Sequence, residues 1–123
     1  MQGLHLTADL FDCRGPRELL VNAELLHNLC EGLTRQAGLT VVGAHFHAFG
    51  SGGGVTGSLL LAESHLAIHT WPELGAVTLD VYVCNFMDDN SAKATALMDA
   101  LVSRFDSARC VRHSLSRGRA DPA

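Results

Sequence analysis

The stretch that decides the fold is VTGSLLLAESHLAIHTWPELGAVTLDVYVC, residues 55–84. It contains three runs typical of β-strands: residues 55–62, which are mostly apolar, residues 65–71, which end at Pro72, and residues 76–84, which alternate between apolar and polar side chains. The breaks between these runs are short, and short connections join antiparallel neighbours rather than parallel strands. The stretch therefore predicts an antiparallel sheet.

The flanking segments complete the expected order of elements. Gly38 is expected to close a first helix, and Ser91 is expected to cap a second one. The predicted elements outside the central stretch are strands at 4–11, 40–49 and 110–115 and helices at 19–33 and 91–105. This order predicts one α/β domain over residues 1–123, a two-layer sandwich of a mainly antiparallel sheet with two helices on one face.

Composition and charge exclude several classes of protein. The chain has 123 residues, of which 47% are hydrophobic and 18% charged, so it forms a core rather than a disordered chain. A net charge of −4 argues against a nucleic-acid partner, and no apolar run approaches a membrane span or a secretory signal. The four cysteines lie far apart, so we expect free thiols and a cytoplasmic protein.

The predicted helices cover only one face of the sheet. Because the other face would then need cover, we expect a homodimer.

Four polar residues interrupt the apolar core of the deciding stretch: Glu63, Ser64, His65 and His69. Burying such groups costs free energy unless they are hydrogen-bonded, so their clustering indicates a local network or a site. Ser64 and His69 are five residues apart, and an odd spacing places two residues on opposite faces of a continuous strand. The two side chains meet only if the chain turns or bulges near Ser64.

These residues belong to a longer pattern. The chain resembles the prokaryotic, pyruvoyl-dependent S-adenosylmethionine decarboxylase proenzyme family over nearly its whole length. The resemblance rests on ESHLAIHTWPE at 63–73 and DVYVC at 80–84, with support from Gly-x-His-Leu at 3–6, VVGAHFHAF at 41–49 and GVTG at 54–57.

The resemblance implies a zymogen that cleaves itself between Glu63 and Ser64. Ser64 would become a covalent pyruvoyl group, the only cofactor, and His69 would be the base for processing. We expect the glycine-rich turn at 50–54 to help the backbone approach closely. The products would be a β chain of residues 1–63 and an α chain of residues 64–123 that begins with the pyruvoyl group.

The resemblance also implies the chemistry of the mature enzyme. The substrate amine forms a Schiff base with the pyruvoyl ketone, carbon dioxide leaves, and Cys84 donates a proton to the product. Phe49, Trp71 and Glu73 are the expected substrate-binding residues, because aromatic faces suit an adenine ring and a sulfonium cation. Thr56 either assists processing or is an ordinary strand residue. The activity would belong to polyamine, and specifically spermidine, biosynthesis in a homodimer of cleaved protomers.

Departures from the family pattern leave the substrate open. Leu74-Gly75-Ala76-Val77 replaces the usual Tyr-Gly-Tyr-Ala, and Asn85 replaces a glycine. The same chemistry on L-ornithine or L-arginine is therefore an alternative, in which Asp80 or Glu73 would bind the distal cationic group.

A second alternative belongs to another class of protein. His45 and His47 share one strand face, as do His65 and His69, and four imidazoles are able to hold a transition metal in a small metal-binding protein. We rank this alternative below the pyruvoyl enzyme, for which no metal is expected, because the histidines have an adjacent Glu-Ser pair and no acidic groups to orient them.

Overall fold

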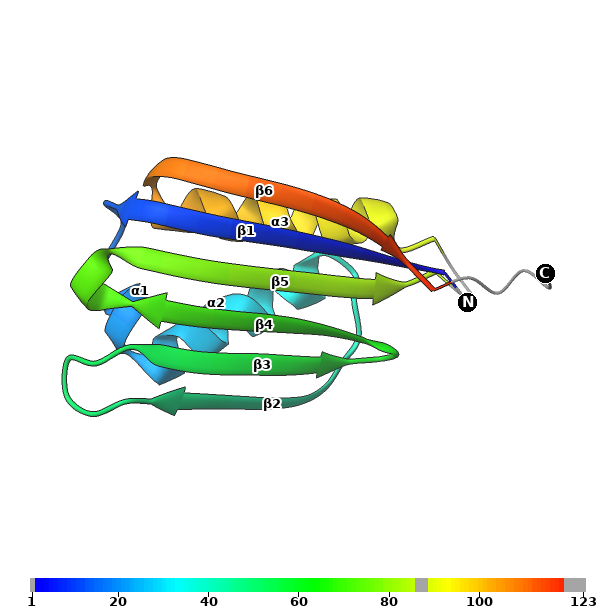
Figure 1. Cartoon of the computed structure of the whole chain (residues 1–123). Coiled ribbons are helices and arrows are strands. Elements are labelled where there is room, and N and C mark those ends of the chain that lie inside the picture. Colours follow the sequence, from blue (N-terminus) through cyan, green and yellow to red (C-terminus); the bar gives the residue numbers. More distant parts are fainter. Residues whose placement is uncertain (1, 86–88, 119–123) are drawn as a thin grey trace.

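The computed structural model describes residues 2–85 and 89–118. Its centre is a six-stranded sheet in the order β2-β3-β4-β5-β1-β6, in which each pair of neighbours is antiparallel (Figure 1). The strands are β1 (Gly3–Cys13), β2 (Val41–Ala48), β3 (Val55–Leu61), β4 (Ser64–Trp71), β5 (Ala76–Cys84) and β6 (Ser107–Arg117). The predicted antiparallel sheet and fold class are confirmed. The last strand is longer than predicted because it pairs with β1 from Ser107 to Arg117.

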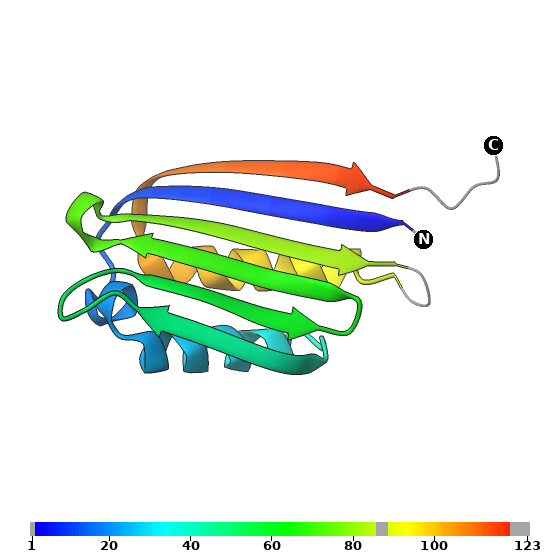
Figure 2. The same cartoon turned by 60° about the horizontal axis from the view of Figure 1, so that its bottom comes forward.

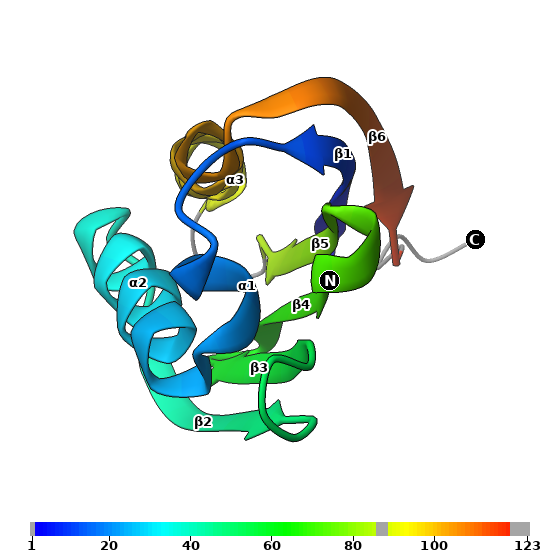
Figure 3. The ribbon, with the colours of Figure 1, turned by 90° about the vertical axis from the view of Figure 1, so that its left-hand side faces the viewer.

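Three helices pack on one face of this sheet, α1 (Glu18–Val21), α2 (Ala23–Gln36) and α3 (Ser91–Phe105) (Figures 2 and 3). The single first helix predicted from apolar spacing is wrong, because Asn22 has extended backbone angles and interrupts it. The side chain of Asn22 accepts a hydrogen bond from the Leu25 amide at 3.0 Å, so it caps α2. The predicted cap at Ser91 is also shifted by one residue, since Asn90 occupies the N-cap position.

The core lies between the helices and the sheet. On β5, Val77, Val81 and Val83 are completely buried and Leu79 nearly so, as the alternation predicts. The same layer contains Leu59, Leu66 and Ile68 from the neighbouring strands and Leu26, Leu97, Met98, Leu101 and Phe105 from the helices. Burial of this apolar face holds the strands in register, because a slip of one residue would turn each apolar side chain outward.

In the part of the chain that the structure describes, no helix covers the opposite face of the sheet, which we call the outer face (Figure 3). Alternation places Thr78, Asp80 and Tyr82 of β5 on this face, next to His65 and His69 of β4. In the described part of the chain, no helix is both long enough and apolar enough to cross a membrane. The outer face of the sheet thus presents a row of polar side chains.

Candidate active site

Ser64 begins β4 directly after a two-residue turn. Ser64 pairs with Leu61 across this turn, and the turn residues are Ala62 and Glu63. The Ser64 hydroxyl oxygen accepts a hydrogen bond from the Cys84 backbone N–H at 3.2 Å. This bond fixes the orientation of the hydroxyl on the residue that follows the peptide bond between Glu63 and Ser64.

Cys84 is held in place as the last residue of β5. Its carbonyl oxygen accepts a hydrogen bond from the Asn90 side chain at 2.9 Å. The next residue, Asn85, donates its backbone N–H to the Gln2 carbonyl at 2.7 Å and accepts the Asn90 backbone N–H at 2.8 Å through its side chain. Asn85, which stands where a glycine was expected, therefore anchors the start of α3 beside Cys84.

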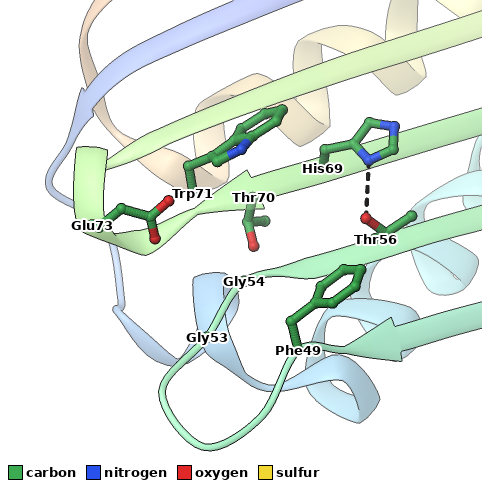
Figure 4. Close-up of a pocket in the computed structure, with 8 residues that line it drawn as sticks. All are labelled: Phe49, Gly53, Gly54, Thr56, His69, Thr70, Trp71 and Glu73. Atoms are coloured by element: carbon green, nitrogen blue, oxygen red, sulfur yellow. Dashed lines mark hydrogen bonds between the residues drawn. The ribbon is translucent and has the colours of Figure 1, made fainter.

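A second group of residues surrounds a hollow at the other end of β4 (Figure 4). Its volume is about 380 Å³, and its lining consists of Phe49, Gly53, Gly54, Thr56, His69, Thr70, Trp71 and Glu73. Phe49 and Trp71 stand on either side of it and remain 58% and 37% exposed. All three predicted substrate-binding residues and the predicted base thus line one hollow, with two aromatic rings free to stack on a ligand.

The ring of His69 is oriented by a hydroxyl group. The Nδ1 atom of His69 lies 3.1 Å from the Thr56 Oγ1 atom across the β3–β4 pair. The His69 and Trp71 rings are 6.0 Å apart, measured between centroids. When Nδ1–H donates to Thr56, the Nε2 atom keeps its lone pair and is able to accept a proton.

Thr70 is a residue that the sequence reasoning missed. Its hydroxyl donates to the Leu20 carbonyl of α1 at 2.7 Å and accepts the Val55 N–H at 2.8 Å. It is the only polar member of the buried row formed with Leu66 and Ile68 on β4. That exception to the apolar alternation was the available signal for a buried hydrogen-bonding role.

The glycine-rich turn allows close packing at the hollow and not beside Ser64. A β-carbon on Gly53 would collide with the Phe49 carbonyl oxygen, and one on Gly54 would collide with the Thr70 carbonyl oxygen. Gly54 directly precedes β3, whereas Ser64 follows the other end of that strand. The expectation that this turn brings the backbone close to Ser64 is therefore wrong.

Ser64 and His69 do not meet within one protomer. Both belong to β4, whose pairing with β3 and β5 runs without a bulge, so the predicted placement on opposite faces is confirmed. Five residues at about 3.3 Å each separate their backbones by about 16 Å. The site residues therefore form two groups at opposite ends of β4, one with Ser64 and Cys84 and the other with His69 and the hollow.

Comparison with known proteins identifies the family. A model of the S-adenosylmethionine decarboxylase family matches residues 4–118. The chain is 37% identical over 116 residues to the S-adenosylmethionine decarboxylase proenzyme of Aquifex aeolicus (strain VF5), covering 94% of this chain and 81% of that protein. The chain belongs to the S-adenosylmethionine decarboxylase family.

This member of the S-adenosylmethionine decarboxylase family is also similar to a second relative and to a solved structure, in each case over most of its length. It is 34% identical to the proenzyme of Archaeoglobus fulgidus, covering 94% of this chain and 97% of the relative. The crystal structure of the adenosylmethionine decarboxylase from Aquifex aeolicus VF5 superposes with a TM-score of 0.85 at 34% identity and covers 98% of this chain and 94% of that one. The agreement in fold includes the sheet and the helices that cover it.

Two departures from the S-adenosylmethionine decarboxylase pattern lie close to the hollow. Leu74, 66% exposed, follows Glu73 in the short 3₁₀-helix η1 (Pro72–Leu74), and Ala76, 8% exposed, begins β5. Asp80 lies away from the hollow, with one carboxylate oxygen 3.9 Å from the Nε2 atom of His5. Of the two carboxylates considered for a cationic substrate, only Glu73 lines the hollow.

The alternative of a metal-binding protein finds no support in this S-adenosylmethionine decarboxylase fold. Among the described residues, no three histidine, cysteine, aspartate or glutamate side chains are grouped closely enough to hold a metal ion. All four cysteines are free thiols. Burial raises the pKa of the Cys30 thiol from 9.0 to about 12, so this cysteine is a core residue and not a reactive one.

Proposed function

We propose that this chain is an S-adenosylmethionine decarboxylase of polyamine biosynthesis that cleaves itself between Glu63 and Ser64. The observation that carries the proposal is the position of Ser64, whose hydroxyl is held by the Cys84 N–H at 3.2 Å directly after a tight turn. The sequence of this segment, ESHLAIHTWPE, is the one by which the chain resembles the family. The free thiols support a reducing compartment, the cytoplasm.

The cleavage converts one backbone amide into two chain ends. The Ser64 oxygen attacks the Glu63 carbonyl carbon, the C–N bond breaks, and the hydroxyl proton passes to the nitrogen, which leaves an ester. Loss of the Ser64 α-proton then expels the Glu63 carboxylate and leaves dehydroalanine. One water molecule converts the dehydroalanine into a pyruvoyl group and ammonia. The products are residues 1–63 and residues 64–123.

The groups around Ser64 fit a pyruvoyl group formed there. Cys84 supplies a backbone N–H at 3.2 Å for an oxygen at this position. A pyruvoyl ketone provides an electron-withdrawing carbonyl for the decarboxylation of an α-amino acid. The Cys84 thiol is the proposed donor of the proton that replaces the carboxylate on the product.

The hollow is the proposed substrate site. Phe49 and Trp71 offer aromatic faces for an adenine ring and a sulfonium cation, and Glu73 offers a carboxylate for ribose hydroxyls. His69, oriented by Thr56, is the proposed base for processing. A proton transfer needs heavy atoms within about 3 Å, so His69 does not act on the Ser64 of its own protomer.

A homodimer resolves this separation. If two outer faces stack with their strands running in opposite directions, the His69 end of one protomer lies over the Ser64 end of its partner. Leu60 and Leu115, which are 56% and 58% exposed on this face, provide apolar area for such a contact.

The first test measures the substrate and the cofactor together. The purified protein is incubated with carboxyl-labelled S-adenosylmethionine, L-ornithine and L-arginine in parallel, and released carbon dioxide is counted. We expect release from S-adenosylmethionine, two fragments by mass spectrometry, and a ketone that borohydride reduces. Ser64→Ala is the matched control and should remain one chain without activity. Release from ornithine or arginine alone would assign the chain to the alternative substrates, and an active unbroken chain would refute the proposal.

The second test asks whether the site is shared between protomers. His69→Ala should stay largely uncleaved when expressed alone. Co-expression with a tagged Ser64→Ala chain, which supplies His69 but has no nucleophile, should restore cleavage of the His69→Ala chain. Normal cleavage of His69→Ala alone would remove the proposed base, and failure of the mixture to restore cleavage would show that the site is not shared.

A further inference from the structure

The backbone of Glu63 has an unusual conformation for its residue type. Among the described residues, three non-glycine residues have a positive φ angle: Asp12 at 53°, Glu63 at 54° and Asp106 at 46°. Aspartate is common in this left-handed region because its short side chain bonds to the nearby backbone. Glutamate has no such advantage, and a β-carbon in this conformation crowds the following carbonyl oxygen.

The surrounding sheet prevents Glu63 from relaxing. β3 and β4 pair continuously from Thr56 with His69 to Leu61 with Ser64, so the turn is limited to two residues. The neighbouring Ala62 donates its N–H to the Thr40 carbonyl at 3.1 Å, which ties the turn to the segment before β2. Leu59, Leu61 and Leu66 are buried on both sides of the turn and keep the register. A strained residue persists where the surrounding structure determines its conformation in this way.

We propose that the left-handed backbone of Glu63 stores strain that accelerates the attack of Ser64 on the bond between them. This inference rests on the proposed self-cleavage. When the amide becomes an ester, the chain path between the Glu63 carbonyl carbon and the Ser64 α-carbon runs through Oγ and Cβ instead of through the nitrogen alone. The path is one atom longer and rotates more freely, so Glu63 is able to leave the left-handed region. Glu63 is thus a positioning residue for processing.

The test compares substitutions that differ in their tolerance of a positive φ angle. Glu63→Gly relieves the strain, whereas Glu63→Ala keeps the β-carbon and removes only the carboxylate. Glu63→Asn is intermediate, because asparagine tolerates the left-handed region. Full-length precursors are made by cell-free translation, and the fraction cleaved is followed over time on denaturing gels. We expect the glycine variant to be cleaved about 5- to 30-fold more slowly than the alanine variant, which corresponds to about 1–2 kcal/mol, with asparagine between them.

Two further measurements separate strain from other effects. In a Ser64→Ala background, which does not cleave, the glycine substitution should raise the Tm by a few degrees relative to alanine, because the folded precursor is relieved. After full cleavage, the glycine and alanine variants should share one kcat, because the strain is gone. Equal cleavage rates, or no rise in Tm, would overturn the inference. If the parent chain does not cleave between Glu63 and Ser64, both the proposed function and this inference are overturned. If the parent cleaves but the glycine and alanine variants cleave at the same rate, only this inference is overturned.

Discussion

Thr70 of β4 lines the hollow and connects α1 to the start of β3, so its substitution tests what holds β3 and β4 in place beside the hollow. Its hydroxyl bonds to the Leu20 carbonyl of α1 at 2.7 Å and to the N–H of Val55, the first residue of β3, at 2.8 Å. Thr70 is 5% exposed, and Leu20 and Val55 are buried as well. The substitution Thr70→Val preserves the shape of the side chain but leaves a buried donor and a buried acceptor without this partner.

The expected cost follows from those two groups. Each buried polar group that loses its partner costs about 1–3 kcal/mol, so Thr70→Val should lower the free energy of unfolding by about 2–6 kcal/mol. Thr70→Ser keeps the hydroxyl and loses one methyl group, which costs about 1 kcal/mol. The total stability of a domain is about 5–15 kcal/mol, so the difference between the two variants is large enough to measure.

The assay is urea unfolding followed by circular dichroism, in a Ser64→Ala background so that each sample is one intact chain. With a slope of about 2 kcal/mol per molar urea, Thr70→Val should lower the midpoint by about 1–3 M and Thr70→Ser by about 0.5 M. Fluorescence of Trp71, the single tryptophan, reports on the neighbouring hollow in the same experiment. The prediction is refuted if Thr70→Val has the same urea midpoint as its parent, or if Thr70→Ser lowers the midpoint as much as Thr70→Val does.

Three other predictions concern catalysis, binding and the core. Cys84→Ala should still be cleaved but should release carbon dioxide much more slowly, and unchanged turnover would remove Cys84 as proton donor. Phe49→Ala and Trp71→Ala should each raise KM for S-adenosylmethionine about 5- to 30-fold, for a stacking contribution of about 1–2 kcal/mol, with cleavage retained. Because burial raises the pKa of Cys30 to about 12, the protonated thiol is favoured in the folded state, so its contribution to stability is complete below about pH 9 and is lost as the pH rises toward 12. Iodoacetamide at pH 8 should therefore modify the exposed Cys110 before Cys30, and equal rates in the folded protein would contradict this assignment.

The sheet was predictable because strands with one buried face alternate apolar and polar residues in the sequence. The alternation in residues 76–84 predicted both the strand β5 and the face that each of its side chains takes. The break at Asn22 was not predicted, because the apolar spacing continues across it and a single residue with extended backbone angles ends one helix and caps the next. Periodicity reports on which side of an element is buried, whereas such a break depends on how the elements dock.

For the site, the sequence predicted which residues take part but not how they are arranged in space. The motif ESHLAIHTWPE indicated the candidate residues, because the resemblance depends on residue types and spacing alone. It did not indicate that Thr70 joins α1 to the start of β3, since that contact spans 50 positions of the chain. It also gave no sign that Glu63 adopts a positive φ angle, which the pairing of β3 with β4 imposes.

The amino-acid sequence by itself determined the order of the strands, the apolar face of the sheet, the family, and the residues able to carry the chemistry. The tertiary structure alone decided that Ser64 lies beside Cys84, and that His69 lies at the far end of the same straight strand with Phe49 and Trp71. The physical reason is that side-chain types and periodicity are local properties of a chain. Strand register, by contrast, results from the packing of the whole core, and it determines which distant residues share one end of the sheet.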